Sequence, residues 1–213
     1  MKNQIDLKPL FITKFQEIEG KAFIESKENN IKLNTILNYF SKDPEFYNSP
    51  ILNKTLSEPS FDKGLLIIGS FGTGKTAIMM TFSEIFKDLK GLTGHNYIFK
   101  NVFDIVMDYE CLSTSHEKRV FYDKISKGKW LFDDILTEEG ANNYGKINLF
   151  KRLLEIRYSD KKITYCTCNY NPSHPEGLEE SLLQFHHRYD GRVYDRLFEM
   201  FNIIEFKGKS LRK

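Results

Sequence analysis

A glycine-rich segment in the first half of the chain has the residue types and the spacing of a phosphate-binding loop. Residues 69–76 read Gly-Ser-Phe-Gly-Thr-Gly-Lys-Thr and match the pattern G-x-x-x-x-G-K-[ST] at every fixed position. Glycines allow such a loop to turn its backbone N–H groups toward phosphate oxygens. Lys75 can reach the β- and γ-phosphates of a nucleoside triphosphate, and the Thr76 hydroxyl can bind Mg²⁺. The predicted nucleotide contacts are Gly69, Ser70, Phe71, Gly72, Thr73, Gly74, Lys75 and Thr76.

Two adjacent carboxylates follow an apolar run later in the chain. Residues 130–134 read Trp-Leu-Phe-Asp-Asp, which predicts a short buried strand that ends in two acids. In P-loop NTPases this strand lies beside the P-loop strand, and its terminal acid holds the Mg²⁺ shell, which assigns Asp133 to the metal. Asp134 falls where a second carboxylate can polarise the attacking water, although Glu138 or Glu139 could take that role. An acidic turn with no chemical role is the other interpretation.

A polar side chain, Asn169, follows a further apolar run, Ile163-Thr-Tyr-Cys-Thr-Cys168. A strand inserted between the P-loop strand and the acidic strand would put Asn169 between the γ-phosphate and Asp134. There its amide could orient the attacking water and report the state of the nucleotide. Alternatively, Asn-Tyr-Asn-Pro at residues 169–172 is an ordinary exit from a strand into a turn.

Two arginines share one face of a predicted helix near the end of the chain. Arg192 and Arg196 lie four residues apart, and an apolar stripe covers another face of the same helix. An arginine that reaches the γ-phosphate bound by a neighbouring subunit is an arginine finger and can contribute ~10³–10⁵ in rate. The alternative is an ion pair within the helix, from Arg192 to Asp195 or from Arg196 to Glu199. The residues alone leave both interpretations open.

Strand and helix patterns alternate from residue 64 onward. Apolar strands that alternate with helices predict an α/β fold with a parallel sheet covered on both faces, as in P-loop NTPases. The expected strands cover residues 65–68, 97–103, 130–133, 163–168 and 203–206, and the expected helices cover residues 75–87, 104–110, 147–158 and 191–201.

The chain divides into three predicted parts. Residues 1–48 read as a helical N-terminal extension, because apolar residues between 33 and 40 recur at helical spacing. Residues 49–63 are rich in turn-forming residues and are the predicted linker. Residues 64–213 form the predicted nucleotide-binding domain.

The composition limits the classes of protein to which the chain can belong. The 213 residues, 40% of them hydrophobic, suffice for one packed α/β domain with a short extension. No apolar run approaches the ~20 residues that span a bilayer. The three cysteines fit neither a zinc site nor a disulfide framework, and the five histidines lack metal spacing. We therefore expect a cytoplasmic protein with no membrane contact.

Basic residues alternate with aromatic ones between residues 116 and 129. The lysines and the arginine of this stretch could neutralise phosphates while Phe121 or Tyr122 stacks on a base. The preferred interpretation is an amphipathic helix with a solvated charged face. The basic tail at residues 207–213 is another candidate phosphate contact. The net charge of +2 neither demands nor excludes nucleic acid.

Together these motifs resemble the DnaC/IstB-like branch of AAA+ ATPases, which includes bacterial helicase loaders and transposition ATPases. This chain has Leu136 where the family often has glycine. The resemblance covers residues 60–213 and rests on the order and spacing of five segments: Gly-Thr-Gly-Lys-Thr at 72–76, Phe-Asp-Asp-Ile-Leu-Thr-Glu at 132–138, Thr-Cys-Asn at 167–169, Gly-Arg-Val-Tyr-Asp-Arg-Leu at 191–197, and Lys-Ser-Leu-Arg at 209–212.

The resemblance implies roles for particular residues. It implies ATP rather than GTP as the ligand, Asn169 as the sensor-1 residue, and Arg196 as the arginine finger with Arg192 as second choice. Arg212 would be a sensor-2 arginine that touches the γ-phosphate in cis. The predicted catalytic set is Asp134, Asn169, Arg196 and Arg212. The implied fold is an AAA+-type parallel sheet flanked by helices. As a departure from the family, we expect no full C-terminal helical lid, because few residues of this sequence follow Arg212.

The resemblance also implies partners. Subunits are expected to stack with ATP between them and to contact single-stranded DNA. They are also expected to bind a replicative helicase or another DNA-processing protein. The expected function is an ATPase of DNA replication, slow and stimulated by DNA or a partner, that loads or remodels a replicative helicase on single-stranded DNA. A compact ATPase of a phage or mobile element fits this description. The alternatives are a transposition or target-site regulator that assembles on duplex DNA and, less favoured, a P-loop kinase of a small molecule.

Overall fold

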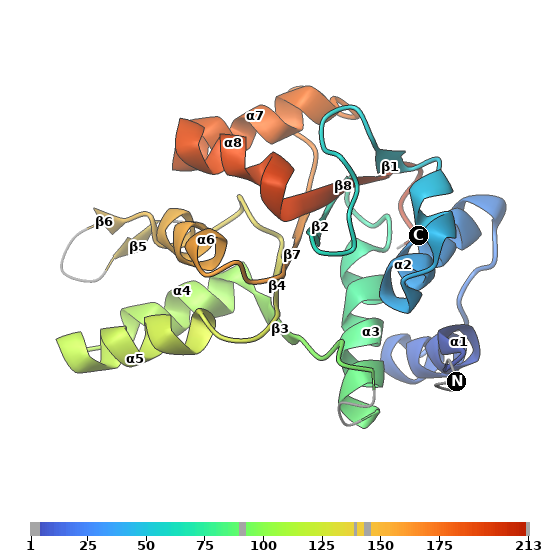
Figure 1. The fold of residues 1–213 in the computed structure, drawn as a ribbon, viewed down its shortest axis with the longest axis horizontal. Helices are drawn as coiled ribbons and strands as arrows, with labels where there is room; N and C mark the ends of the chain where they lie inside the picture. Colours follow the sequence, from blue (N-terminus) through green and yellow to red (C-terminus); the bar gives the residue numbers. More distant parts are fainter. Residues whose placement is uncertain (1–4, 90–92, 139, 143–145, 212–213) are drawn as a thin grey trace.

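A central sheet with helices on both faces forms the body of the protein (Figure 1). The computed structural model describes residues 5–89, 93–138, 140–142 and 146–211. The helices are α1 (Leu7–Glu19), α2 (Lys27–Ser41), α3 (Lys75–Asp88), α4 (Val102–Glu110), α5 (Ser115–Ile125), α6 (Leu149–Ser159), α7 (Leu178–Tyr189) and α8 (Gly191–Met200), with a 3₁₀ turn η1 (Pro44–Asn48). The strands are β1 (Leu52–Asn53), β2 (Gly64–Gly69), β3 (Ile98–Asn101), β4 (Trp130–Asp133), β5 (Ala141–Asn142), β6 (Lys146–Ile147), β7 (Thr164–Cys168) and β8 (Phe201–Phe206).

Six strands form the main sheet in the order β1-β8-β2-β7-β4-β3, and β5 pairs with β6 in a separate two-stranded sheet. All neighbours in the main sheet are parallel except the short edge strand β1, which runs antiparallel to β8. The residues of β2, β4 and β7 are buried throughout, as expected for strands that are covered on both faces. The predicted α/β fold is confirmed.

The acidic strand does not lie beside the P-loop strand, so the simpler expectation for P-loop NTPases is wrong here. β7 lies between β2 and β4, with Leu66 paired to Cys166 and Cys166 paired to Phe132. The inserted-strand arrangement that would place Asn169 near Asp134 is therefore confirmed.

Successive residues of the central strands alternate between two hydrophobic clusters, because neighbouring side chains of a strand point to opposite faces. Leu66 and Ile68 of β2 pack into a cluster with α4 to α8. Leu65 and Ile67 pack into a second cluster with α1, α2 and α3. Figure 1 shows the same division, with α1 to α3 on one side of the sheet and α4 to α8 on the other.

The two N-terminal helices belong to the second cluster and cover α3. The ring of Phe11 in α1 lies 5.2 Å from that of Phe82 in α3, and the ring of Phe40 in α2 lies 4.8 Å from that of Phe86. Both helices end in a left-handed residue, at Gly20 and Lys42. The division of the chain at residues 48 and 63 stays a prediction.

One helix departs from the elements expected from the sequence, and another agrees with the preferred interpretation of the basic stretch. α7 follows the turn after β7 and was not expected, and α5 is the amphipathic helix considered for the basic stretch. In the described part of the chain nothing helical follows β8. Within the same residues no helix is both long and apolar enough to cross a membrane.

Candidate nucleotide-binding site

The loop between β2 and α3 has the backbone geometry of an anion-binding turn. Gly72 and Gly74 have φ angles of 76° and 93°, a left-handed conformation that glycine adopts without strain. Gly74 is the N-cap of α3, and none of the described side chains caps this helix. The first N–H groups of α3 can therefore bind an anion in front of the helix.

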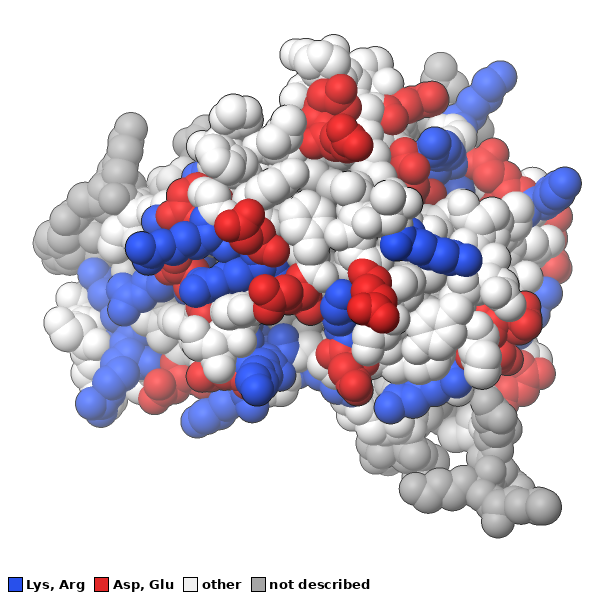
Figure 2. Space-filling view, turned by 45° about the horizontal axis from the view of Figure 1, so that its top comes forward, with Lys and Arg blue, Asp and Glu red and all other residues white. Residues whose placement is uncertain are grey.

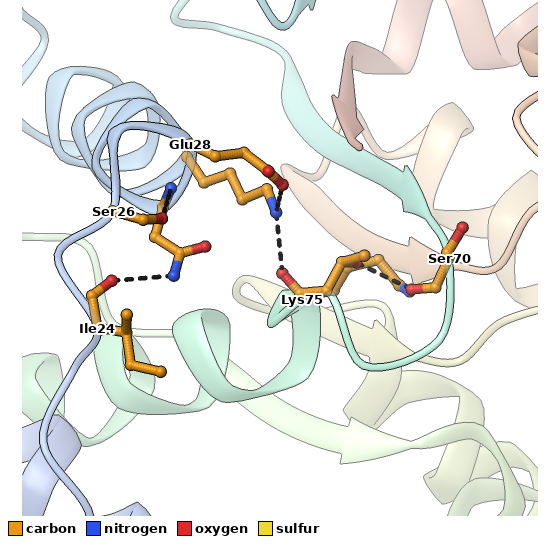
Figure 3. Close-up of polar contacts among 8 residues, drawn as sticks. Ile24, Ser26, Glu28, Ser70 and Lys75 are labelled. Carbon is orange, nitrogen blue, oxygen red and sulfur yellow. Dashed lines mark hydrogen bonds and ion pairs between the residues drawn. The ribbon is translucent and has the colours of Figure 1, made fainter. Parts of the chain in front are cut away.

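The Lys75 amine lies against the loop and reaches the end of β7. Lys75 is 5% exposed. Its Nζ donates hydrogen bonds to the carbonyl oxygens of Gly69 at 2.8 Å and Ser70 at 3.0 Å, and to Asn169 Oδ1 at 2.9 Å. Figure 3 shows Lys75 extended toward Ser70 along the loop. The predicted phosphate-binding amine and the predicted sensor residue are thus in direct contact.

Oxygen atoms suited to Mg²⁺ gather at the end of β4. Asp133 Oδ1 accepts hydrogen bonds from Thr76 Oγ1 at 3.0 Å and from Thr167 Oγ1 at 2.6 Å. Burial raises the pKa of the Asp133 carboxyl group, the Thr167 hydrogen bond opposes that rise, and the negative charge of Asp134 adds to it. A divalent cation would stabilise the ionised form of this buried acid, and carboxylate and hydroxyl oxygens are ligands that Mg²⁺ prefers. The donor set therefore fits Mg²⁺.

Asp134 is held in an unusual backbone conformation beside Asn169. Its φ is 59°, and its N–H donates to Thr167 Oγ1 at 2.9 Å. Asn169 Nδ2 lies 3.4 Å from Asp134 Oδ1, so the Asn169 amide bridges Lys75 and Asp134. The Thr167 hydroxyl binds both acidic residues, a role that the sequence motifs did not predict. Its position two residues before Asn169 was the only available signal.

Glu138, considered as a competitor of Asp134, lies elsewhere. Its carboxylate is 4% exposed and accepts a hydrogen bond from the Tyr189 hydroxyl at the end of α7. Burial raises the pKa of Glu138, and the bond from Tyr189 opposes this rise. The structure therefore places Asp134, and not Glu138, beside Lys75 and Asn169. Glu139 lies outside the described residues.

The predicted finger arginines are not part of this cluster. The guanidinium of Arg196 lies 4.4 Å from the centre of the Tyr158 ring in α6, and Arg192 is exposed. Among the described residues, neither arginine forms the ion pair to Asp195 or Glu199 that was considered for this helix. Arg212 lies outside the described residues.

A cavity of about 340 Å³ adjoins the cluster, within the size range of small-ligand pockets. One part of its wall consists of residues 71–78 of the loop and α3, with Asp134 and Asn169. The opposite part comes from the N-terminal helices and the segment between them, including residues 21–24 and Asn29. No motif in the sequence predicts a role for these N-terminal residues.

Two solved structures share the fold of this chain. The crystal structure of the DnaC helicase loader matches with a TM-score of 0.58 and 18% sequence identity over 93% of this chain and 98% of that chain. The crystal structure of DnaI matches with a TM-score of 0.55 and 18% identity over 98% of this chain and 94% of that chain. No protein-family model and no curated protein matches the sequence. The AAA+-type fold expected from the resemblance is therefore confirmed as a fold.

Proposed function

We propose that the chain binds ATP with Mg²⁺ and hydrolyses it as an AAA+-type ATPase of DNA replication, where it loads or remodels a replicative helicase on single-stranded DNA. One observation carries the proposal. Lys75, the acid pair Asp133 and Asp134, and Asn169 come from three separate segments and meet beside one cavity at the N-terminus of α3.

Each group of this cluster has a defined part in the proposed hydrolysis. The N–H groups of residues 72–76 and the Lys75 amine bind and orient the triphosphate. Thr76 and Asp133 would hold Mg²⁺, which would supply neutralisation of phosphate charge. Asp134 accepts a proton from the attacking water, and Asn169, bonded to both Lys75 and Asp134, keeps that water in line with the γ-phosphate.

The far part of the cavity supports ATP over GTP. Asn29 of α2 is buried and lines the cavity. Its Nδ2 donates to the carbonyl oxygen of Ile24 at 2.9 Å, which fixes the orientation of the amide. None of the described residues donates to Asn29 Oδ1, so this oxygen can accept a hydrogen bond from a ligand. An acceptor at this position can bind the amino group of adenine, which is a donor. It would repel the O6 oxygen of guanine, which is itself an acceptor.

The proposed loader role is supported by the fold and by the charged surface. The DnaC structure, which shares the fold, is described as that of a helicase loader. Figure 2 shows Lys and Arg side chains spread over this face of the molecule, most densely at its left end, and interspersed with Asp and Glu. In α5 the rings of Phe121 and Tyr122 pack against Tyr109, so they are engaged within the protein. We therefore assign DNA contact to phosphate neutralisation by the exposed basic residues rather than to base stacking.

The proposal is tested by ATP turnover measured without DNA, with single-stranded DNA and with duplex DNA, using Lys75→Ala as the blank. We expect slow turnover that single strands stimulate and that Lys75→Ala abolishes together with ATP binding. Stimulation by duplex alone would favour the transposition or target-site regulator, and turnover indifferent to DNA would remove DNA from the mechanism. Turnover of the wild type equal to that of the blank in all three conditions would contradict the ATPase assignment.

A further inference from the structure

A fully buried lysine of α2 contacts the phosphate-binding loop. Lys32 is 1% exposed, although lysine is seldom buried so completely. Its Nζ forms an ion pair with Glu28 Oε1 at 2.7 Å and lies 3.5 Å from the carbonyl oxygen of Thr73. Figure 3 shows Glu28 facing the loop that carries Ser70 and Lys75. Lys32 precedes the P-loop motif by about 40 residues of sequence and belongs to none of the motifs that predict nucleotide binding.

The contact with Thr73 reaches a peptide group of the loop itself. In a trans peptide the C=O and N–H groups point in opposite directions, and the chain has no cis peptide bonds among the described residues. A positive charge at the carbonyl oxygen of Thr73 therefore favours a peptide whose other end, the N–H of Gly74, points away from Lys32. Gly74 is the N-cap of α3, where the loop N–H groups must point toward a bound phosphate.

The buried surroundings of Lys32 limit the screening of its charge. The amine also lies 5.7 Å from the centre of the buried Phe206 ring. Because water is excluded, its charge is screened less than that of a surface lysine. The only charged group that the structure pairs with it, among the described residues, is Glu28, whose side chain is 52% exposed and therefore hydrated.

The chain segment after β8 holds Glu28 and the loop together. Gly208 has a φ of 115°, and a side chain there would collide with the Glu28 carboxylate. Leu211 N donates to the carbonyl oxygen of Gly72 at 2.9 Å, and a side chain on Gly72 would collide with Ser210. Residues 207–211 therefore close over both Glu28 and the loop, and they fix the place of the ion pair behind it.

We infer that Lys32 is a positioning residue of the triphosphate site: from behind the loop it orients the Thr73–Gly74 peptide and adds positive potential to the bound triphosphate, while Glu28 moderates that potential. This inference rests on the proposed ATP binding. The proposed role and a purely structural ion pair predict different changes in ATP affinity when the Glu28 charge is removed. Removal of the Lys32 charge weakens ATP binding, whereas removal of the Glu28 charge leaves it equal or makes it tighter. A structural pair would weaken binding in both cases.

The experiment compares the dissociation constants of ATP and ADP for the wild type, Lys32→Met, Glu28→Gln and Lys75→Ala, together with the thermal unfolding midpoint of each. Methionine keeps the unbranched shape of lysine in an apolar setting, and glutamine keeps the shape of glutamate. For Lys32→Met we expect ATP affinity about tenfold weaker, a smaller loss for ADP, and an unfolding midpoint that is not lowered. Glu28→Gln is expected to bind ATP at least as tightly as the wild type.

Each outcome decides between the two roles. Lys32→Met binding ATP within twofold of the wild type would overturn the inference, as would Glu28→Gln binding ATP more weakly than the wild type. If Lys32→Met does not fold, the Glu28→Gln comparison still decides the sign of the effect. A wild type that binds no ATP would overturn the proposed function and this inference together. If Lys75→Ala loses ATP binding while Lys32→Met keeps it, the inference alone would be overturned.

Discussion

Thr167 illustrates how one side chain can organise a reaction centre that has two acids. Its hydroxyl donates to Asp133 Oδ1 and accepts from the N–H of Asp134, so it fixes the two residues relative to each other. The positive φ of Asp134 would otherwise cost about 1 kcal/mol or more for a residue that is not glycine. The hydroxyl therefore helps to keep the second acid turned toward Asn169.

The proposed role of Asn29 in base recognition gives a prediction at the residue scale. In Asn29→Ala the acceptor opposite the adenine amino group is lost, so the preference for ATP over GTP should fall by about tenfold, the value of one or two hydrogen bonds. The measurement is competition of ATP and GTP for the same site. The ratio of the two affinities is the relevant quantity, because loss of the bond to Ile24 weakens both nucleotides alike.

Ser26→Ala is the matched control for this prediction. The Ser26 hydroxyl accepts a hydrogen bond from the N–H of Asn29 as the N-cap of α2, so its removal loosens the same turn without touching the amide. The control should lower stability by about 1 kcal/mol and leave the nucleotide ratio unchanged. An unchanged ratio in Asn29→Ala itself would remove Asn29 from base recognition.

Part of this site was predictable from the sequence. Lys75, Asp133, Asp134 and Asn169 lie in motifs or at strand ends where the residue type limits the chemistry, and the structure brings them together. Lys32, an isolated residue of an amphipathic helix, gave no such signal. Its place depends on how α2 packs against α3 and β8, and nothing in the local sequence encodes that packing.

At the scale of elements, the local patterns predicted β4 to the residue and α3 to within one residue. They failed for α7, which has a charged and histidine-rich surface over a narrow buried face. The order of the strands is a property of pairing between distant segments. The sequence indicated only that Asn169 would lie near Asp134 if its strand were inserted between the P-loop strand and the acidic strand. The apolar runs themselves do not determine the order of the strands.

Arg157 joins several elements and gives a prediction at this scale. It is fully buried in α6, and its guanidinium donates to the Thr164 hydroxyl and to the carbonyl oxygens of Ile125, Gly128 and Ile163. Burial lowers its pKa to about 10, so it remains charged at neutral pH. Arg157→Leu leaves these acceptors unpaired and should lower the free energy of unfolding by about 3–5 kcal/mol in urea denaturation.

Arg152→Leu is the control on the same helix. Arg152 is exposed and lies 4.3 Å from the centre of the Tyr122 ring, so its loss should cost about 1 kcal/mol or less. Equal losses in the two variants would mean that the carbonyl oxygens around Arg157 find other donors, and that α5, α6 and β7 are joined mainly by apolar packing.

At the scale of the whole molecule, one chain carries the groups for both parts of the proposed reaction at separate places. The acid pair and Lys75 lie at the N-terminus of α3, whereas Arg196 packs on Tyr158 of α6 and is absent from the residues that line the described cavity. A head-to-tail assembly could bring Arg196 of one copy to the ATP of the next. The hydrolysis rate should then depend on protein concentration.

Mixing two inactive variants tests this assembly directly. Arg196→Ala should bind ATP normally and lose hydrolysis, because the transition-state charge lacks its cation, and Asp134→Asn should do the same because the water lacks its base. In an equal mixture about a quarter of the head-to-tail interfaces pair an intact Asp134 with an intact Arg196, so turnover should return in part. Tyr158→Phe, which keeps the ring under Arg196 and loses only the bond to Glu199, should hydrolyse ATP normally. Normal hydrolysis by Arg196→Ala alone would refute the finger role and leave Arg192 to be tested in the same way.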